Sequence, residues 1–159
     1  MKIISVLRKS GLGVAAIIIA AGMSATAPSQ AQDNMMMMKD RVALMKEMGK
    51  NLGMIGKAVK GEMAVDLAAL GPAAATISAN ATKLKGMFPE GSGGGESRSL
   101  PAIWEKKDDF DGYFDKLASA GDAFAKEAAS GSMANLKASF GAIASNCGGC
   151  HKPYRAAKE

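Results

Sequence analysis

Five consecutive residues near the end of the chain, Cys147-Gly148-Gly149-Cys150-His151, place two thiols and an imidazole at a fixed spacing. This C-x-x-C-H pattern is typical of covalent c-type haem attachment, in which the thiols bind the porphyrin vinyl groups and the imidazole binds the iron. In a helix, positions i, i+3 and i+4 share one face, so the three side chains point at the same object. They are the only two cysteines and the only histidine of the 159 residues. The sequence therefore predicts one covalent haem c on Cys147 and Cys150, with His151 as the proximal iron ligand.

Other uses of two nearby thiols fit the chain less well. A zinc site needs four ligands, usually cysteine or histidine, and this chain offers three in total. A thioredoxin-like dithiol needs a βαβ context, and the sequence has no convincing strand pattern. A structural disulfide between Cys147 and Cys150 remains open, although it leaves His151 without a role.

Residues 1–31 have the features of a secretory signal peptide. Lys2, Arg8 and Lys9 give a basic start, residues 12–21 are apolar and uncharged, and Ser29-Gln30-Ala31 offers small residues at a cleavage site. The apolar run is shorter than the roughly 20 residues that a membrane-spanning helix needs, which disfavours an uncleaved anchor. Since covalent haem attachment and export go together in bacteria, we expect a periplasmic protein that is not embedded in the membrane.

Residues 32–159 are long enough for one domain and carry little net charge. The whole chain has 20 Lys and Arg against 15 Asp and Glu, and three of the basic residues lie in the signal peptide. The high isoelectric point therefore does not indicate nucleic-acid binding. The near-neutral total also predicts no strong field that would steer a partner protein.

Four amphipathic helical stretches are predicted, over about 33–60, 66–87, 101–131 and 132–158. Their apolar positions recur at steps of three and four, and short connections join them, except for the Gly- and Ser-rich loop at 90–99. This pattern predicts an all-α, antiparallel four-helix bundle with the haem between helices towards one end. The expected inner positions of the third stretch are Phe110, Phe114, Leu117, Gly121, Phe124 and Ala128.

Several details of the helices follow from single residues. Asp33 or Asn34 is the expected N-cap of the first helix, and Gly61 is its expected C-cap. Glycines within that helix, at 49, 53 and 56, suggest close approach by another helix or by something flat. Pro153 is expected to kink or loosen the turn that carries His151.

The sixth iron ligand has to be Met, Lys or nothing, because there is no second histidine. The run Met35–Met38 is a weak candidate, since consecutive residues face all sides of a helix. Met45, Met48 and Met54 lie further inside the first helix. Periodicity alone does not choose between Met45 and Met48.

Three stretches resemble a known family. They are the C-terminal C-x-x-C-H followed by Tyr154-Arg155, the segment Arg41-Val42-Ala43-Leu44-Met45-Lys46 with Lys60-Gly61-Glu62, and Pro101-Ala102-Ile103-Trp104. Together they are similar to the class II cytochromes c, which include the cytochromes c′ and the low-spin cytochromes of the c556 type. The resemblance covers the whole predicted mature chain, whereas Pro153 and the paired glycines of the haem motif are less usual for the family.

The resemblance implies roles for individual residues. Cytochromes c′ carry an apolar non-ligand, often Leu, four residues after the arginine, and low-spin members carry Met followed by Lys. Because Met45 stands four residues after Arg41, the resemblance implies Met45 as the sixth ligand. It also implies that Arg41 lies near a haem propionate, Arg155 near His151, and Trp104 beside the haem edge.

The leading functional hypothesis is a monohaem one-electron carrier that serves unidentified redox partner proteins. No acid–base pair or nucleophile constellation is visible, so the chain is not expected to be an enzyme, and a peroxide-handling enzyme would need a second distal base. The alternative is a c′-like protein with a five-coordinate iron that binds NO or CO, which Met45 argues against. The sequence leaves monomer and homodimer open.

Overall fold

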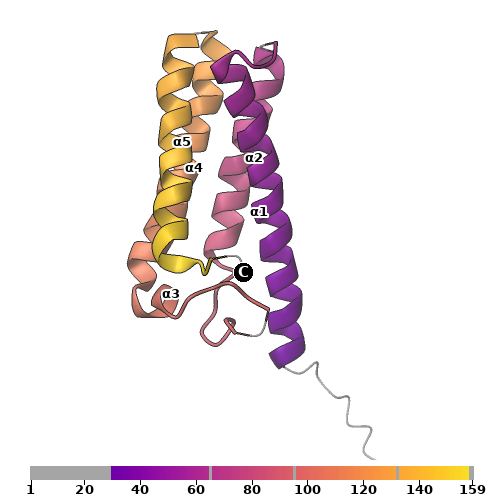
Figure 1. The fold of residues 1–159 in the computed structure, drawn as a ribbon, viewed down its shortest axis with the longest axis vertical. Coiled ribbons are helices and arrows are strands. Elements are labelled where there is room, and N and C mark those ends of the chain that lie inside the picture. Colours follow the sequence, from indigo (N-terminus) through magenta and orange to yellow (C-terminus); the bar gives the residue numbers. More distant parts are fainter. Residues whose placement is uncertain (1–29, 65, 95, 132, 158–159) are drawn as a thin grey trace, which may run out of the picture.

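The computed structural model describes residues 30–64, 66–94, 96–131 and 133–157. Its helices are α1 (Gln30–Lys60), α2 (Leu67–Lys85), α3 (Ala102–Glu105), α4 (Lys107–Ser130) and α5 (Met133–Tyr154). Four of them, α1, α2, α4 and α5, run alternately up and down the molecule (Figure 1). The predicted all-α antiparallel four-helix bundle is therefore confirmed. Most of the predicted signal peptide, residues 1–29, lies outside the described residues.

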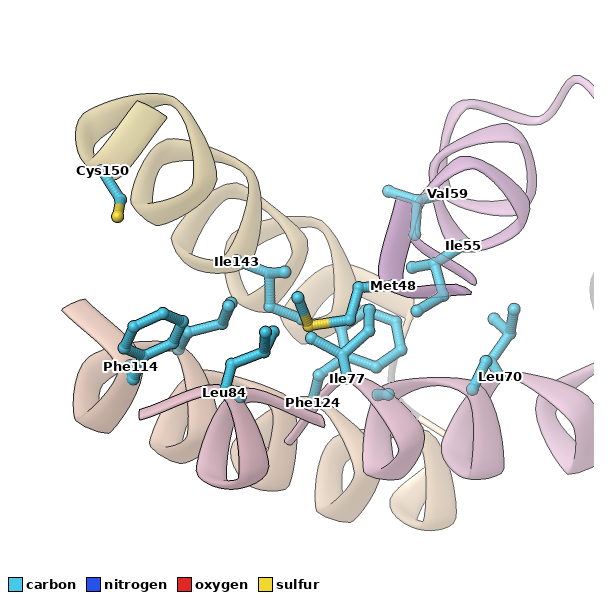
Figure 2. Close-up of a cluster of buried hydrophobic side chains, with 14 of the residues drawn as sticks. Met48, Ile55, Val59, Leu70, Ile77, Leu84, Phe114, Phe124, Ile143 and Cys150 are labelled. Atoms are coloured by element: carbon cyan, nitrogen blue, oxygen red, sulfur yellow. The ribbon is translucent and has the colours of Figure 1, made fainter. Parts of the chain in front are cut away.

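One hydrophobic core fills the space between the four long helices. The six inner positions predicted for α4 are the six that the structure buries there. Figure 2 shows buried side chains of all four helices in one cluster, with Met48 of α1 directed into it. Helices that bury one apolar stripe each and leave the other face polar are what such a bundle requires.

The bundle brings α2 and α4 into very close contact at Gly121. A Cβ at this position would lie 2.9 Å from the carbonyl oxygen of Ala74 and 3.0 Å from the amide nitrogen of Ser78. Both neighbours are backbone atoms and have little freedom to move away. On the other side of the bundle, a Cβ on Gly56 of α1 would lie 3.1 Å from the ring of Phe140. The prediction that a glycine of α1 permits a close helix approach is confirmed at Gly56.

The predicted C-cap of α1 agrees with the structure, whereas its predicted N-cap does not. Gly61 has φ 78° and its amide donates to Ala58, while the amide of Glu62 donates to Lys57, which is a Schellman end. The predicted N-cap of α1 is wrong, since the helix already includes Gln30 and so contains both Asp33 and Asn34.

Two predicted helices differ from the structure. The third is divided by Lys106, whose non-helical backbone (φ −129°, ψ 50°) separates α3 from α4. The last ends at Tyr154 and not near Lys158, because the chain then turns to pair with Ser99. Pro153 therefore falls in the final turn of α5. The helix continues without a break through His151, so Pro153 does not interrupt the turn that carries it.

No helix within the described ranges has the length and apolar character to cross a membrane.

Candidate haem site

Two adjoining cavities open at the end of the bundle where α5 ends. Their volumes are about 220 Å³ and about 450 Å³, and four residues line both: Met45, Gly49, Cys150 and His151. The smaller one is lined mostly by apolar core residues, including Ile77 and Phe114. The larger one opens towards the loop after α2. Together they form the space that we call the haem cavity, and ligand sites of several hundred Å³ are typical of proteins.

The haem motif occupies the last turns of α5, as predicted. Cys150 is buried and Cys147 is half-buried, and both are free thiols. Burial, followed by the neighbouring Cys147, raises the pKa of the Cys150 thiol to about 11, and burial also raises the pKa of Cys147. The two side chains therefore enter the cavity as neutral thiols at neutral pH. The structure gives no support for a disulfide between them.

His151 lines both parts of the cavity beside Cys150. Burial is the main cause that lowers the pKa of His151, and the positive charges of Arg155 and Arg98 lower this pKa further. The neutral imidazole that results is the form that binds a metal ion.

Helix α4 holds the motif in place through Tyr113. Asn146, which directly precedes the motif, donates a 2.9 Å hydrogen bond to the carbonyl oxygen of Tyr113. The Tyr113 ring also lies against Gly149, where a Cβ would come within 3.2 Å of it. The second glycine of the motif thus allows α4 to approach, while Gly148 has open space around it. Sequence reasoning missed Tyr113, which stands beside the core position Phe114.

Arg41 is a buried cation at the edge of the larger cavity. Only 4% of its surface is exposed, and its guanidinium donates to the carbonyl oxygen and hydroxyl of Ser92 at 2.8 and 3.2 Å. It also donates to the carbonyl oxygen of Met87 and lies 4.6 Å from the ring centre of Phe88. Burial lowers the pKa of Arg41. Among the described residues, no carboxylate lies within ion-pair distance of it.

The loop after α2 and the C-terminal segment close the same end of the bundle. The amide of Leu100 donates to Tyr154, and the amide of Ala156 donates to Arg98 at 2.9 Å. The Arg98 side chain donates in turn to the carbonyl oxygen of Ala156. These hydrogen bonds place the side chains of Arg98 and Arg155 at the cavity near His151. Arg155 was predicted there, whereas Arg98 lies in a polar loop whose sequence has no periodicity to place it.

The methionines of α1 take different positions. Met45 is half-buried and lines both parts of the cavity, whereas Met48 is buried in the core and lines only the smaller part. Met38, the last of the methionine run, lines the larger part, and Met54 lines neither. The structure therefore brings Met45 together with His151 and the two cysteines more fully than any other methionine it describes.

Trp104 contacts the loop after α2. Its indole nitrogen donates to the carbonyl oxygens of Phe88 and Pro89 at 3.3 and 2.9 Å, and its ring lies against Gly93. It lines neither part of the cavity, whereas its neighbour Ile103 lines the larger one. In this structure Trp104 supports the loop that carries Ser92.

These residues fit a covalently attached haem. Two thiols and an imidazole enter an apolar cavity from one helix, and this donor set is the one that binds haem c. A buried guanidinium without a carboxylate partner suits an anionic propionate. Gly49, where nothing lies within 4 Å of an added Cβ, leaves room for a flat group against α1.

The comparisons with known proteins agree with this site. The family model described as Cytochrome C′ matches residues 36–155. A cytochrome c′ of Rhodopseudomonas palustris is 40% identical over 119 residues, covering 74% of this chain and 80% of that protein. A cytochrome c-556 of Agrobacterium fabrum is 36% identical over 118 residues, covering 74% of this chain and 80% of that protein. The solved structure of R. palustris cytochrome c′ matches with a TM-score of 0.69 and 37% identity, covering 77% of this chain and 98% of that one.

The fold and the site thus define a four-helix-bundle haem protein. The chain belongs to the cytochrome c′ family of class II cytochromes c, and it binds one covalent haem c.

Proposed function

We propose that the protein is a periplasmic one-electron carrier in which His151 and Met45 would hold the haem iron. The observation that supports this most strongly is that Met45 lines both parts of the haem cavity together with His151. The bound haem supplies the Fe(III)/Fe(II) couple, and a thioether ligand favours the ferrous form. Because the only histidine is assigned to the iron, the proposal includes no acid–base catalysis.

Other cavity residues also have roles in this proposal. The apolar lining, which includes Ile77, Phe114 and Ile143, excludes water and so limits rearrangement of solvent when the charge on the iron changes. Arg41 offsets the charge of a propionate inside the protein, where an unpaired carboxylate would be costly. The predicted signal peptide supports the periplasmic location.

A second candidate is a gas-binding protein of the c′ kind, with an open sixth position. The relative from R. palustris at 40% identity is named cytochrome c′, and so is the solved structure at 37% identity. The matching family model and the solved structure from Shewanella frigidimarina also carry the name cytochrome c′, so the names favour this candidate, although other relatives are named cytochrome c-554 and c-556. Met45 at the cavity is the observation that favours the electron carrier.

The absorption spectrum of the reduced holoprotein, recorded before and after addition of CO, separates the two candidates. If Met45 binds the iron, we expect a low-spin spectrum that CO does not change. An immediate shift of the Soret band would mean that the sixth position is open, and the gas-binding candidate would then replace the electron carrier.

A further inference from the structure

Helix α1 carries a row of exposed lysines, one of which, Lys46, lines the haem cavity. Successive members stand seven, four, seven and three residues apart, so at 3.6 residues per turn they fall within an arc of about 80°. The members of this lysine row are Lys39, Lys46, Lys50, Lys57 and Lys60. The acidic residues of α1 lie on a different side, where the carboxylate of Glu47 accepts a hydrogen bond from Asn80 of α2.

The charges of the lysine row are not neutralised by nearby carboxylates. All five side chains are exposed, and within the described part of the chain none is in an ion pair. Lys46 itself lines the larger part of the haem cavity, where Arg98 and Arg155 add two further exposed cations. Glu96 is the exposed carboxylate that lines this part of the cavity. The cavity opening is thus basic, with Lys46, Arg98 and Arg155 against Glu96.

An exposed apolar residue lies next to this charge. Val42 is 45% exposed, lines the larger part of the cavity, and stands on α1 between Lys39 and Lys46. An apolar centre with a charged rim is the usual composition of a protein–protein interface. Opposite charges across such an interface mainly increase the rate of association.

We propose that the lysine row and Val42 form the docking surface for an acidic protein that exchanges electrons with the haem. The inference rests on the proposed electron-carrier function and names the kind of partner that it requires. An anionic membrane is the less suitable occupant, because a helix that lies on a membrane needs a free apolar face to insert. The apolar face of α1, with Met48, Ile55 and Val59, is buried in the core.

The test uses the holoprotein with Lys39→Gln and Lys50→Gln together. Along the helix axis, Lys39 lies about 9 Å from Met45 and Lys50 about 7.5 Å from it, which is within one Debye length at about 0.1 M salt. The matched control is Lys126→Gln with Lys137→Gln, which removes the same charge from exposed positions of α4 and α5. Plastocyanin, an acidic copper protein, serves as the probe that oxidises the reduced cytochrome in stopped-flow measurements.

At low ionic strength, we expect the Lys39/Lys50 variant to react about tenfold more slowly with plastocyanin than the wild type. The control variant should change the rate by roughly twofold at most, and added salt should remove the difference between the two variants. Equal rates for both variants would overturn the proposal, because only the total charge would then matter.

A membrane role is tested by sedimentation with phosphatidylcholine–phosphatidylglycerol vesicles in a ratio of about three to one. Vesicle binding that the Lys39/Lys50 variant loses, combined with unchanged plastocyanin rates, would overturn the proposal in favour of a membrane surface. The CO spectrum of the same wild-type sample tests the iron ligation separately. If the electron-carrier proposal is wrong, CO will shift the spectrum of the wild-type protein. If only the docking surface is wrong, the Lys39/Lys50 variant and the control variant will react with plastocyanin at equal rates.

Discussion

Met45 of α1 and His151 of α5 line both parts of one cavity, while Met48, one helical turn further along α1, points into the core. The structure therefore distinguishes Met45 from Met48, which the hydrophobic periodicity of α1 alone does not. It also allows a matched pair of substitutions, because Leu and Met have similar volumes and their exchange usually costs less than about 1.5 kcal/mol.

Met45→Leu should open the sixth coordination position without unfolding the protein. Leucine has no lone pair to bind iron, so we expect the reduced variant to lose the low-spin spectrum and to bind CO. Met48→Leu is the control, and its spectrum should match that of the wild type. A Met45→Leu protein that stays low-spin and does not respond to CO would contradict the assignment of Met45 as the ligand.

Arg41→Gln should destabilise the holoprotein by about 1.5–3 kcal/mol, because hydrogen bonds of a buried charged group are worth about that much. The variant loses charged donors to both the carbonyl oxygen and the hydroxyl of Ser92. Guanidinium denaturation followed by circular dichroism measures the loss. Arg98→Gln removes an exposed arginine from the same end of the bundle and should cost less. Equal losses for the two variants would mean that the burial of Arg41 has no special importance.

Gly121→Ala should destabilise the bundle by about 1–3 kcal/mol, the usual cost of overpacking a tightly packed core. The added methyl group would meet the backbone of Ala74 and Ser78 in α2, which cannot rotate away as a side chain can. Gly112→Ala in the same helix is the matched control, since nothing lies within 4 Å of its added Cβ. This control should be neutral or stabilising by up to about 1 kcal/mol, because alanine is the better helix former. Thermal unfolding of both variants makes the comparison.

The sequence predicted the bundle well because its strongest signal, apolar residues at steps of three and four, directly reflects burial. The inner positions of α4 were all correct, as was the C-terminal position of the haem motif. In α1 the same signal is less reliable, because Val42 stands three residues before Met45 in the apolar pattern and is nevertheless 45% exposed. The middle of this helix faces the haem cavity, where Val42 lines an open space.

Other features could not be predicted from local patterns. The break at Lys106 and the end of α5 at Tyr154 depend on contacts with the loop after α2, which has no periodicity. The burial of Arg41 depends on Ser92, far along the chain, whereas a charged residue on a helix is usually exposed. Likewise, the indole of Trp104 donates to the carbonyl oxygens of Phe88 and Pro89, and these partners cannot be deduced from the sequence motif.

Tyr154 should make the stability of the protein depend on pH in the alkaline range. Its buried hydroxyl donates to Asp109 of α4 at 2.5 Å, and burial, followed by this hydrogen bond, raises the pKa of Tyr154 to about 12. In the unfolded chain, tyrosine has a pKa of about 10. The fold therefore favours the protonated form, and this contribution to stability is complete below pH 10 and is lost as the pH rises towards 12.

Tyr154→Phe removes both the hydrogen bond and the ionisation. At neutral pH we expect the variant to be less stable than the wild type by about 0.5–1.5 kcal/mol. Between pH 10 and 12 this difference should shrink, because only the wild type loses stability through ionisation of Tyr154. Denaturation of both proteins at pH 7 and at pH 11 measures the change. Tyr113→Phe is the control, since the Tyr113 hydroxyl has no hydrogen-bond partner among the described residues. A stability difference between wild type and Tyr154→Phe that stays constant over this pH range would show that Tyr154 does not stay protonated in the fold.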